Sequence, residues 1–319
     1  MGFNSKLISI VVPVFNEQNN LEPLCARIKK VFQNTDYRFE LILVDDGSDD
    51  RSLEVIERLC QQDSAVKFLS FSRNFGHQIA LSAGLDVADG NAVILMDADL
   101  QHPPEVIPAL LDKWREGFKN VYTVRRAEKA SLFKKYSSRI FYRVFHALTK
   151  LNIPMNSADF RLLDRDVVLQ VRKVHERNRF LRGLIFWTGF QSIGIDYEQA
   201  PRHAGQVKYD FKRMVLFAID AICSFTITPL YIGILVGVLV AFLGFVYGAY
   251  ALYIYLFTGT SVPGWASIIS LLGILGGIQL IVIGLIGIYV GKIFEEVKQR
   301  PLYIIRSARG IDESRVSRQ

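Results

Sequence analysis

The sequence predicts an α/β fold with a mostly parallel sheet, followed by two membrane-spanning helices. Short β-branched runs alternate with amphipathic segments over residues 7–96, a pattern typical of right-handed βαβ units. Polar residues follow three of these runs, at the strand ends where open α/β sheets bind ligands. Two segments without charged residues, 230–257 and 266–290, each exceed the roughly 20 apolar residues that cross a bilayer.

Four apolar runs are the expected strands of the sheet. The runs at 7–15 and 39–44 are continuous and rich in Ile, Val and Leu, as expected for parallel strands buried on both faces. Two further runs follow at 66–71 and 92–96. Helices are expected after Asn20 and Ser48, whose side chains can cap a helix N-terminus, and around residues 78–88.

Polar clusters end three of the expected strands, and parallel topology brings them to one edge of the sheet. Asp97 and Asp99 stand one residue apart with Gln101 nearby, a set of oxygen ligands suited to Mg²⁺ or Mn²⁺. Such an ion would hold the phosphates of a nucleotide, although an ordinary acidic turn is the alternative. The three clusters are Asn16-Glu17, Asp45-Asp46 and Asp97-Ala98-Asp99. No Gly-x-Gly-x-x-Gly follows the first strand and no P-loop motif occurs, which disfavours those two nucleotide-binding folds.

The two uncharged segments are flanked by basic residues, in a chain of formal net charge +7. Lys208, Lys212 and Arg213 precede the first segment and Lys292 and Lys298 follow the second, whereas the linker at 258–265 carries no charge. The positive-inside rule therefore places both termini and the large N-terminal domain in the cytoplasm. A buried core helix is the alternative for either segment. The three cysteines are expected to be buried free thiols of a reducing compartment.

Two segments have the pattern of helices that lie on a membrane surface. An apolar stripe over 133–148 has Arg139 and Arg143 among its basic neighbours, and residues 209–225 repeat this pattern before the first span. A solvated basic surface helix is the alternative. The expected organisation is a catalytic domain at 1–208, an interfacial helix at 209–228, a transmembrane hairpin at 229–291 and a cytoplasmic tail at 292–319.

Six motifs in this order resemble the membrane-anchored polyprenyl-phosphate glycosyltransferases of family 2, relatives of dolichyl-phosphate mannose synthase with the GT-A fold. The motifs are VVPVFNE at 11–17, VDDGSDD at 44–50, SRNFGHQIAL at 72–81, MDADLQHPPE at 96–105, DFRLLDR at 159–165 and RHAGQVKY at 202–209. The chain departs from the family at Val207, where serine is usual, which weakens a role for a hydroxyl there but leaves Lys208 intact.

The resemblance implies a role for each group of site residues. The nucleotide sugar would be bound by Pro13, Phe15, Glu17, Asp45, Asp46, Arg73 and Asp97. The metal ligands would be Asp97, Asp99 and Gln101, and the catalytic residues Asp97, Asp99 and Asp159. Because the arginine fork matches phosphate oxygens, the lipid phosphate is assigned first to Arg126 and Arg139. Arg202 and Lys208 are further candidates for the acceptor phosphate, on the side of the donor diphosphate.

The expected reaction is inverting transfer of a hexose from a nucleotide diphosphate sugar, with UDP-glucose the leading donor, to a polyprenyl phosphate such as undecaprenyl phosphate. The expected site is the cytoplasmic face of a bacterial inner membrane, with membrane lipids as partners, no nucleic acid, and homo-oligomerisation left open. Two alternatives remain: a processive polysaccharide synthase, and a non-enzymatic lipid-linked sugar flippase or scaffold. A synthase should carry Gln-x-x-Arg-Trp, which is missing at Trp187, and more than two spans.

Overall fold

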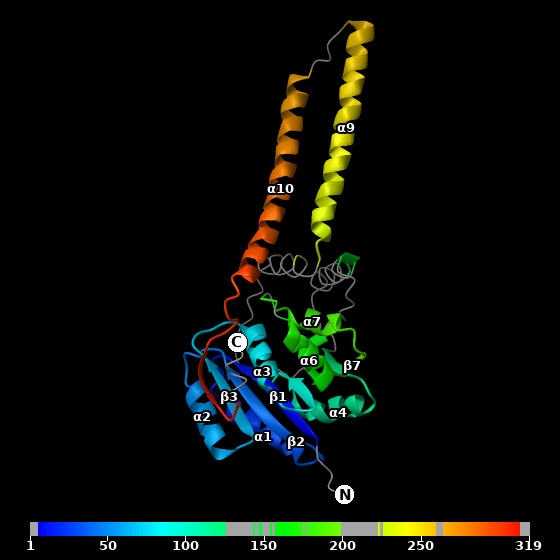
Figure 1. The fold of residues 1–319 in the computed structure, drawn as a ribbon. Helices are drawn as coiled ribbons and strands as arrows, with labels where there is room; N and C mark the ends of the chain where they lie inside the picture. Colours follow the sequence, from blue (N-terminus) through cyan, green and yellow to red (C-terminus); the bar gives the residue numbers. More distant parts are fainter. Residues whose placement is uncertain are drawn as a thin grey trace. The chain divides into compact units, whose positions relative to one another are not determined.

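The computed structural model describes residues 6–125, 143, 147–148, 154, 157–174, 176–177, 179–198, 223, 226–259 and 264–312. The chain divides into two compact units, which are described separately (Figure 1). The first, called here the sheet unit, comprises Met1–His146, Leu151–Lys208 and Arg300–Gln319. The second, the hairpin unit, comprises Ala147–Lys150 and Tyr209–Gln299.

The sheet unit contains an eight-stranded mixed sheet in the order β7-β5-β6-β4-β1-β2-β3-β8. The central strands β4, β1, β2 and β3 run parallel, whereas β6 and β8 are antiparallel to the neighbours they flank. The sequence prediction of a mostly parallel α/β sheet is therefore confirmed. The strands are β1 Leu7–Val14, β2 Arg38–Asp45, β3 Val66–Phe71, β4 Ala92–Leu95, β5 Asn120–Arg125, β6 Ser157–Asp164, β7 Ser192–Tyr197 and β8 Ile305–Arg309.

Helices cover both faces of this sheet, so that the central strands are buried on both sides (Figure 1). One core lies between the sheet and α1, α2 and α4, and the other between the sheet and α3, α6 and α7. The helices are α1 Leu21–Phe32, α2 Ser52–Gln62, α3 His77–Val87, α4 Ile107–Arg115, α6 Arg165–Lys173 and α7 Leu181–Trp187, with a 3₁₀ turn at Pro104–Val106. Burial on both faces explains the continuous apolar runs of β1 and β2.

The two expected helix caps do not form. Asn20 precedes α1, but its side chain makes no capping bond, and its Nδ2 instead donates to Glu17 Oε2 over 2.5 Å. Helix α2 starts at Ser52, so Ser48 lies too early to cap it. The Ser48 amide donates to Asp45 Oδ1, and its hydroxyl accepts from the Asn16 amide. Both side chains therefore stabilise the turns after β1 and β2.

The hairpin unit contains α9 (Thr228–Thr258) and α10 (Trp265–Val297). Stretches of 30 and 27 residues within them have a mean hydropathy of 2.5. The most apolar part of each stretch contains no buried residue. Helices of this length and composition can cross a bilayer. Within the unit, the Tyr289 hydroxyl donates to the Thr226 carbonyl over 2.8 Å.

Cys25, Cys60 and Cys223 are free and buried, as expected.

Candidate active site

A cavity of about 300 Å³ opens in the sheet unit where β1, β2 and β4 end. Its walls are the end of β1, the residues that follow β1, β2 and β4, the loop between β3 and α3, and the first residue of α3. The lining residues are Pro13, Val14, Phe15, Glu17, Asp46, Asn74, Gly76, His77, Asp97, Ala98 and Asp99. The structure thus brings together most of the side chains that the sequence placed at one sheet edge. Phe15 is 43% exposed, so an aromatic face is open there.

The turn after β1 is fixed by Asn16, which adopts the left-handed region with φ of 59°. Asparagine tolerates this conformation better than most residues. Asn16 Oδ1 accepts from the amides of Asp49 and Asp50 at 2.9 and 3.3 Å, which joins the turns after β1 and β2. The Glu17 amide donates to Ser52 Oγ over 2.9 Å. These bonds hold the cavity wall that contains Phe15 and Glu17.

The two acids after β2 have different surroundings. Asp45 is 1% exposed, is not among the lining residues, and accepts from the Ser48 amide and, over 2.7 Å, from Ser70 Oγ. Asp46 lines the cavity and accepts from the amides of Phe75 and Gly76 at 2.6 and 2.9 Å. Burial raises the pKa of Asp46 above its usual range, although these two amides oppose the shift. Asp46 therefore fixes the loop between β3 and α3.

Arg73 lies in this loop but is not among the cavity-lining residues. Its guanidinium carbon is 4.0 Å from the centre of the Phe75 ring, and its Nη1 donates to the Asn74 carbonyl. The positive charge therefore packs on the face of the aromatic ring beside the cavity.

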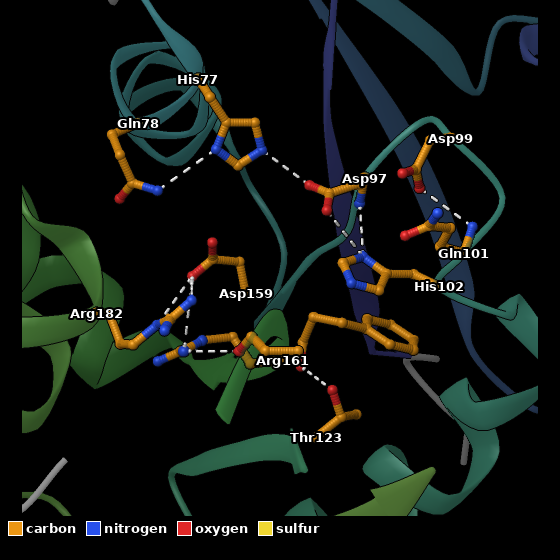
Figure 2. A network of polar contacts seen from close by, with 12 residues as sticks. His77, Gln78, Asp97, Asp99, Gln101, His102, Thr123, Asp159, Arg161 and Arg182 are labelled. Carbon is orange, nitrogen blue, oxygen red and sulfur yellow. Dashed lines mark hydrogen bonds and ion pairs between the residues drawn. The ribbon is translucent and has the colours of Figure 1, made fainter. Parts of the chain in front are cut away.

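Asp97 is held by two histidines (Figure 2). His77 Nε2 lies 2.8 Å from Asp97 Oδ1, and the Asp97 amide donates to His102 Nδ1 over 3.0 Å. Because His102 Nδ1 accepts, its proton sits on Nε2, which is buried without a partner among the described residues. Burial acts to raise the pKa of Asp97, but the neighbouring imidazoles and the Arg125 guanidinium lower it to about 2. Asp97 is therefore ionised at neutral pH.

Asp99 and Gln101 form a tight turn after β4. Asp99 Oδ1 accepts from the Gln101 amide over 3.1 Å, and Leu100 between them has φ of 61° (Figure 2). Among the described residues, no group of three or more His, Cys, Asp or Glu side chains is placed to hold a metal. Two carboxylates and one amide form an incomplete ligand set. Such a set fits a hard divalent ion that also takes phosphate oxygens and water.

Asp159, on β6, lies near Asp97 and His77 and is bound by arginine (Figure 2). Nη2 and Nε of Arg182, on α7, lie 3.0 and 3.3 Å from Asp159 Oδ1. Arg161 Nη2 lies 3.9 Å from the same oxygen. Burial acts to raise the pKa of Asp159, but the two guanidiniums lower it below its usual range. Asp159 is thus an ionised acid between two cations.

Arg161 is 1% exposed, which is rare for a charged side chain. Its Nη2 donates to the Ala158 carbonyl over 2.8 Å, and its Nη1 has no partner among the described residues. Burial lowers the pKa of Arg161 to about 10, although Asp159 acts to raise it, so the guanidinium remains charged at neutral pH. Its charge is balanced mainly by Asp159.

Four titratable residues of this site were not assigned from the sequence: His77, His102, Arg161 and Arg182. His77, His102 and Arg161 stand inside quoted motifs, and Arg182 interrupts the apolar segment FLRGLIFW. A charged residue in an apolar segment was the available signal for both arginines. The four predicted phosphate ligands, Arg126, Arg139, Arg202 and Lys208, lie outside the described residues.

Comparison with known proteins identifies the family of the chain. The model of glycosyl transferase family 2 matches residues 9–172. The chain is 42% identical over 311 residues to the glycosyltransferase YkcC of Bacillus subtilis, covering 97% of this chain and 96% of the relative. It is 38% identical over 303 residues to the SfII prophage-derived bactoprenol glucosyl transferase of Shigella flexneri, covering 94% and 98%.

Among solved structures, the chain resembles glucosyl-3-phosphoglycerate synthase from Mycobacterium tuberculosis in complex with Mn²⁺, UDP and phosphoglyceric acid. The identity is 17%, the TM-score 0.48, and the match covers 68% of this chain and 76% of that one.

The fold and the matched sequence define a glycosyltransferase with a GT-A domain. The chain belongs to glycosyl transferase family 2. The predicted fold, family and enzyme class are therefore confirmed.

Proposed function

We propose that this enzyme transfers a hexose from a nucleotide diphosphate sugar to a polyprenyl phosphate, with inversion at the anomeric carbon. The observation that carries the proposal is a division of charge: Asp97 and Asp99 line the cavity, whereas nearby Asp159 is bound by two arginines. An acidic side suits a donor whose diphosphate is held through a cation. A cationic side suits an anionic acceptor. The relative named bactoprenol glucosyl transferase supports glucose as the sugar and a polyprenyl carrier.

The donor occupies the 300 Å³ cavity. Phe15 offers an exposed aromatic face for the base, beside Pro13 and Glu17. Asp45 supports the donor site indirectly, because it accepts from the Ser48 amide and so holds the turn that precedes Ser52. UDP-glucose is the leading donor. Arg73, in the loop that contributes Asn74 and Gly76 to the cavity wall, is proposed as a partner of its phosphates.

The departing nucleoside diphosphate gains negative charge as the bond to the sugar breaks. Asp97, Asp99 and Gln101 would hold a divalent ion, Mg²⁺ or Mn²⁺. When bound, that ion supplies positive charge to the leaving phosphates. His77 and His102 keep Asp97 in place for this task.

The acceptor needs no general base. A phosphate monoester has a second pKa near about 6, so its oxygen is already a dianionic nucleophile at neutral pH. Asp159 is itself ionised and bound by Arg182, so its task is to position the guanidiniums of Arg182 and Arg161. Arg126, Arg139, Arg202 and Lys208 are proposed, from the sequence alone, as further partners of the phosphates.

The two apolar helices support a membrane setting. We assign both as spans of a bacterial inner membrane, with the catalytic domain and both termini in the cytoplasm and undecaprenyl phosphate as the carrier. The basic residues on both flanks and the uncharged linker support this orientation.

A panel of nucleotide sugars tests the reaction. The purified enzyme should convert a short-chain polyprenyl phosphate into a lipid with a single sugar, with UDP-glucose the best donor. Chelation should abolish the product, and Mg²⁺ or Mn²⁺ should restore it, because without the cation the carboxylates of Asp97 and Asp99 repel the leaving diphosphate. Product mass and anomeric configuration are the readouts. A polymeric product would favour a synthase, and no product with any donor would favour a flippase or scaffold.

Replacement of Arg139 tests the acceptor assignment. In Arg139→Ala, loss of one charge-assisted contact should raise the apparent KM for the lipid about tenfold, with little change for the nucleotide sugar. Initial rates at varied lipid and donor concentrations measure both constants. Arg115→Ala, at an exposed site on α4, is the matched control. The opposite pattern, a raised donor KM alone, would remove Arg139 from the acceptor site.

A further inference from the structure

We propose that the segment after the second span, through Tyr303 and β8, holds the loop that forms one wall of the donor cavity. This inference rests on the proposed function only in taking the cavity as the nucleotide site. Tyr303 is assigned as a positioning residue, because it acts on the cavity through other residues. No role for this segment was predicted from the sequence.

Strand β8 extends the sheet beside β3. It runs antiparallel to β3, with Phe68 opposite Arg309 and Phe71 opposite Ile305. The pairing continues past the end of β3, where the Ser72 amide donates to the Ile304 carbonyl over 2.9 Å. This bond lies at the first residue of the loop 72–76. The C-terminal segment thus fixes the point where the loop leaves the sheet.

Tyr303 contacts both elements that flank this loop. The side chain is 2% exposed, and its ring stacks on Phe71 of β3, with centroids 4.8 Å apart and an interplanar angle of 27°. Its hydroxyl donates to Asp86 Oδ2 of α3 over 3.3 Å. Helix α3 starts at His77, directly after the loop. A single side chain therefore connects the strand before the loop with the helix after it.

The loop in turn forms part of the cavity wall. The ring of Phe71 meets Phe75 edge-on at 5.7 Å, and the amides of Phe75 and Gly76 donate to Asp46. Asn74 and Gly76 line the cavity together with Asp46. A continuous series of contacts therefore runs from Tyr303 through Phe71 and Phe75 to the wall.

The loop is also packed closely from its other side, so a displacement cannot be absorbed there. A Cβ on Gly47, after β2, would lie 2.4 Å from the carbonyl carbon of Arg73. Gly47 has φ of 69°, where only glycine is free of strain. The loop backbone therefore fits between the turn after β2 and the Tyr303 contacts. Loss of the Tyr303 side chain removes the packing on the side of the loop that faces the C-terminal segment.

One consequence concerns where the catalytic domain ends. The donor cavity depends on residues on both sides of the transmembrane hairpin, since the sheet unit contains 300–319 as well as residues before 209. A catalytic domain cut at 208 would lack β8 and Tyr303.

Substitution of Tyr303 in the full chain, purified in detergent, tests the inference. In Tyr303→Leu, the loop amides at 72–76 should exchange with deuterium faster than in the parent enzyme. The Kd for UDP with Mn²⁺ should rise about fivefold, the lower end of typical coupling between sites. Donor KM should rise with it, while turnover at saturating donor stays close to that of the parent. Tyr303→Phe keeps the stacking and should recover most of the affinity.

Phe32→Leu is the matched control. Phe32 is 4% exposed and packs against Phe39 in the other core, so its loss lowers stability without affecting the loop. Unchanged loop exchange and UDP affinity in Tyr303→Leu, or equal changes in Phe32→Leu, would overturn the inference. If Tyr303→Leu does not fold, Tyr303→Phe must still speed exchange at the loop, since it loses the bond to Asp86. A parent enzyme that binds no UDP would instead contradict the donor assignment, while the exchange data would still decide the role of β8.

Discussion

Asp99→Asn should lower turnover by about 10² or more, with no loss of the fold. The asparagine side-chain oxygen can still accept from the Gln101 amide, so the turn after β4 keeps its bond. What is lost is the negative charge that holds a divalent ion against the leaving diphosphate. Because this interaction strengthens as the leaving group departs, the effect should fall on turnover more than on donor KM. Steady-state kinetics with UDP-glucose measure both constants.

Asp112→Asn is the control for this variant, since Asp112 is an exposed acid on α4 that pairs with Arg115. It should keep the activity of the parent enzyme. Melting curves of both variants should match the parent within a few degrees. Parent-like turnover in Asp99→Asn, or full activity of the parent enzyme with the metal chelated, would exclude a metal role for this turn.

The sequence predicted the parts of the fold that rest on local pattern. The apolar runs that form β1 to β4 could be recognised in the sequence, because strands buried on both faces are apolar throughout. The convergence of Asp46, Asp97 and Asp99 followed from parallel topology alone. Helix starts were less predictable: Ser48 looked like a cap, yet tertiary bonds to Asn16 and Asp45 determine its conformation.

Features that depend on distant partners could not be predicted. Strand β8 is five residues long and pairs with a strand more than two hundred residues earlier in the chain, so no periodicity reveals it. The same holds for Arg182, whose partner on β6 is 23 residues away in sequence. Adjacent acids also differ: Asp45 ends β2 and accepts from Ser70 of β3, whereas Asp46 begins the following loop and lines the cavity.

Asp159→Asn should lower both stability and turnover. Arg161 is buried and balanced mainly by Asp159, so removing that charge leaves a buried cation without its partner, at a cost of about 3 kcal/mol. The folded-state pKa of Asp159 is depressed, so in the parent enzyme this stability is present above about pH 4 and lost below it. The variant should lack it at neutral pH. Chemical denaturation at pH 7, and again below about pH 3, measures the difference.

The pH profile of the same variant separates positioning from base catalysis. In the parent enzyme the rate should fall below about pH 6, because the acceptor phosphate takes up a proton there. Asp159 is already ionised at that pH, so Asp159→Asn should keep this acidic limb while turnover drops throughout. Asp159→Glu should restore part of the stability, and Asp196→Asn, at an exposed site on β7, should change neither property. Disappearance of the acidic limb in Asp159→Asn would instead assign the titrating group to Asp159 and make it the base.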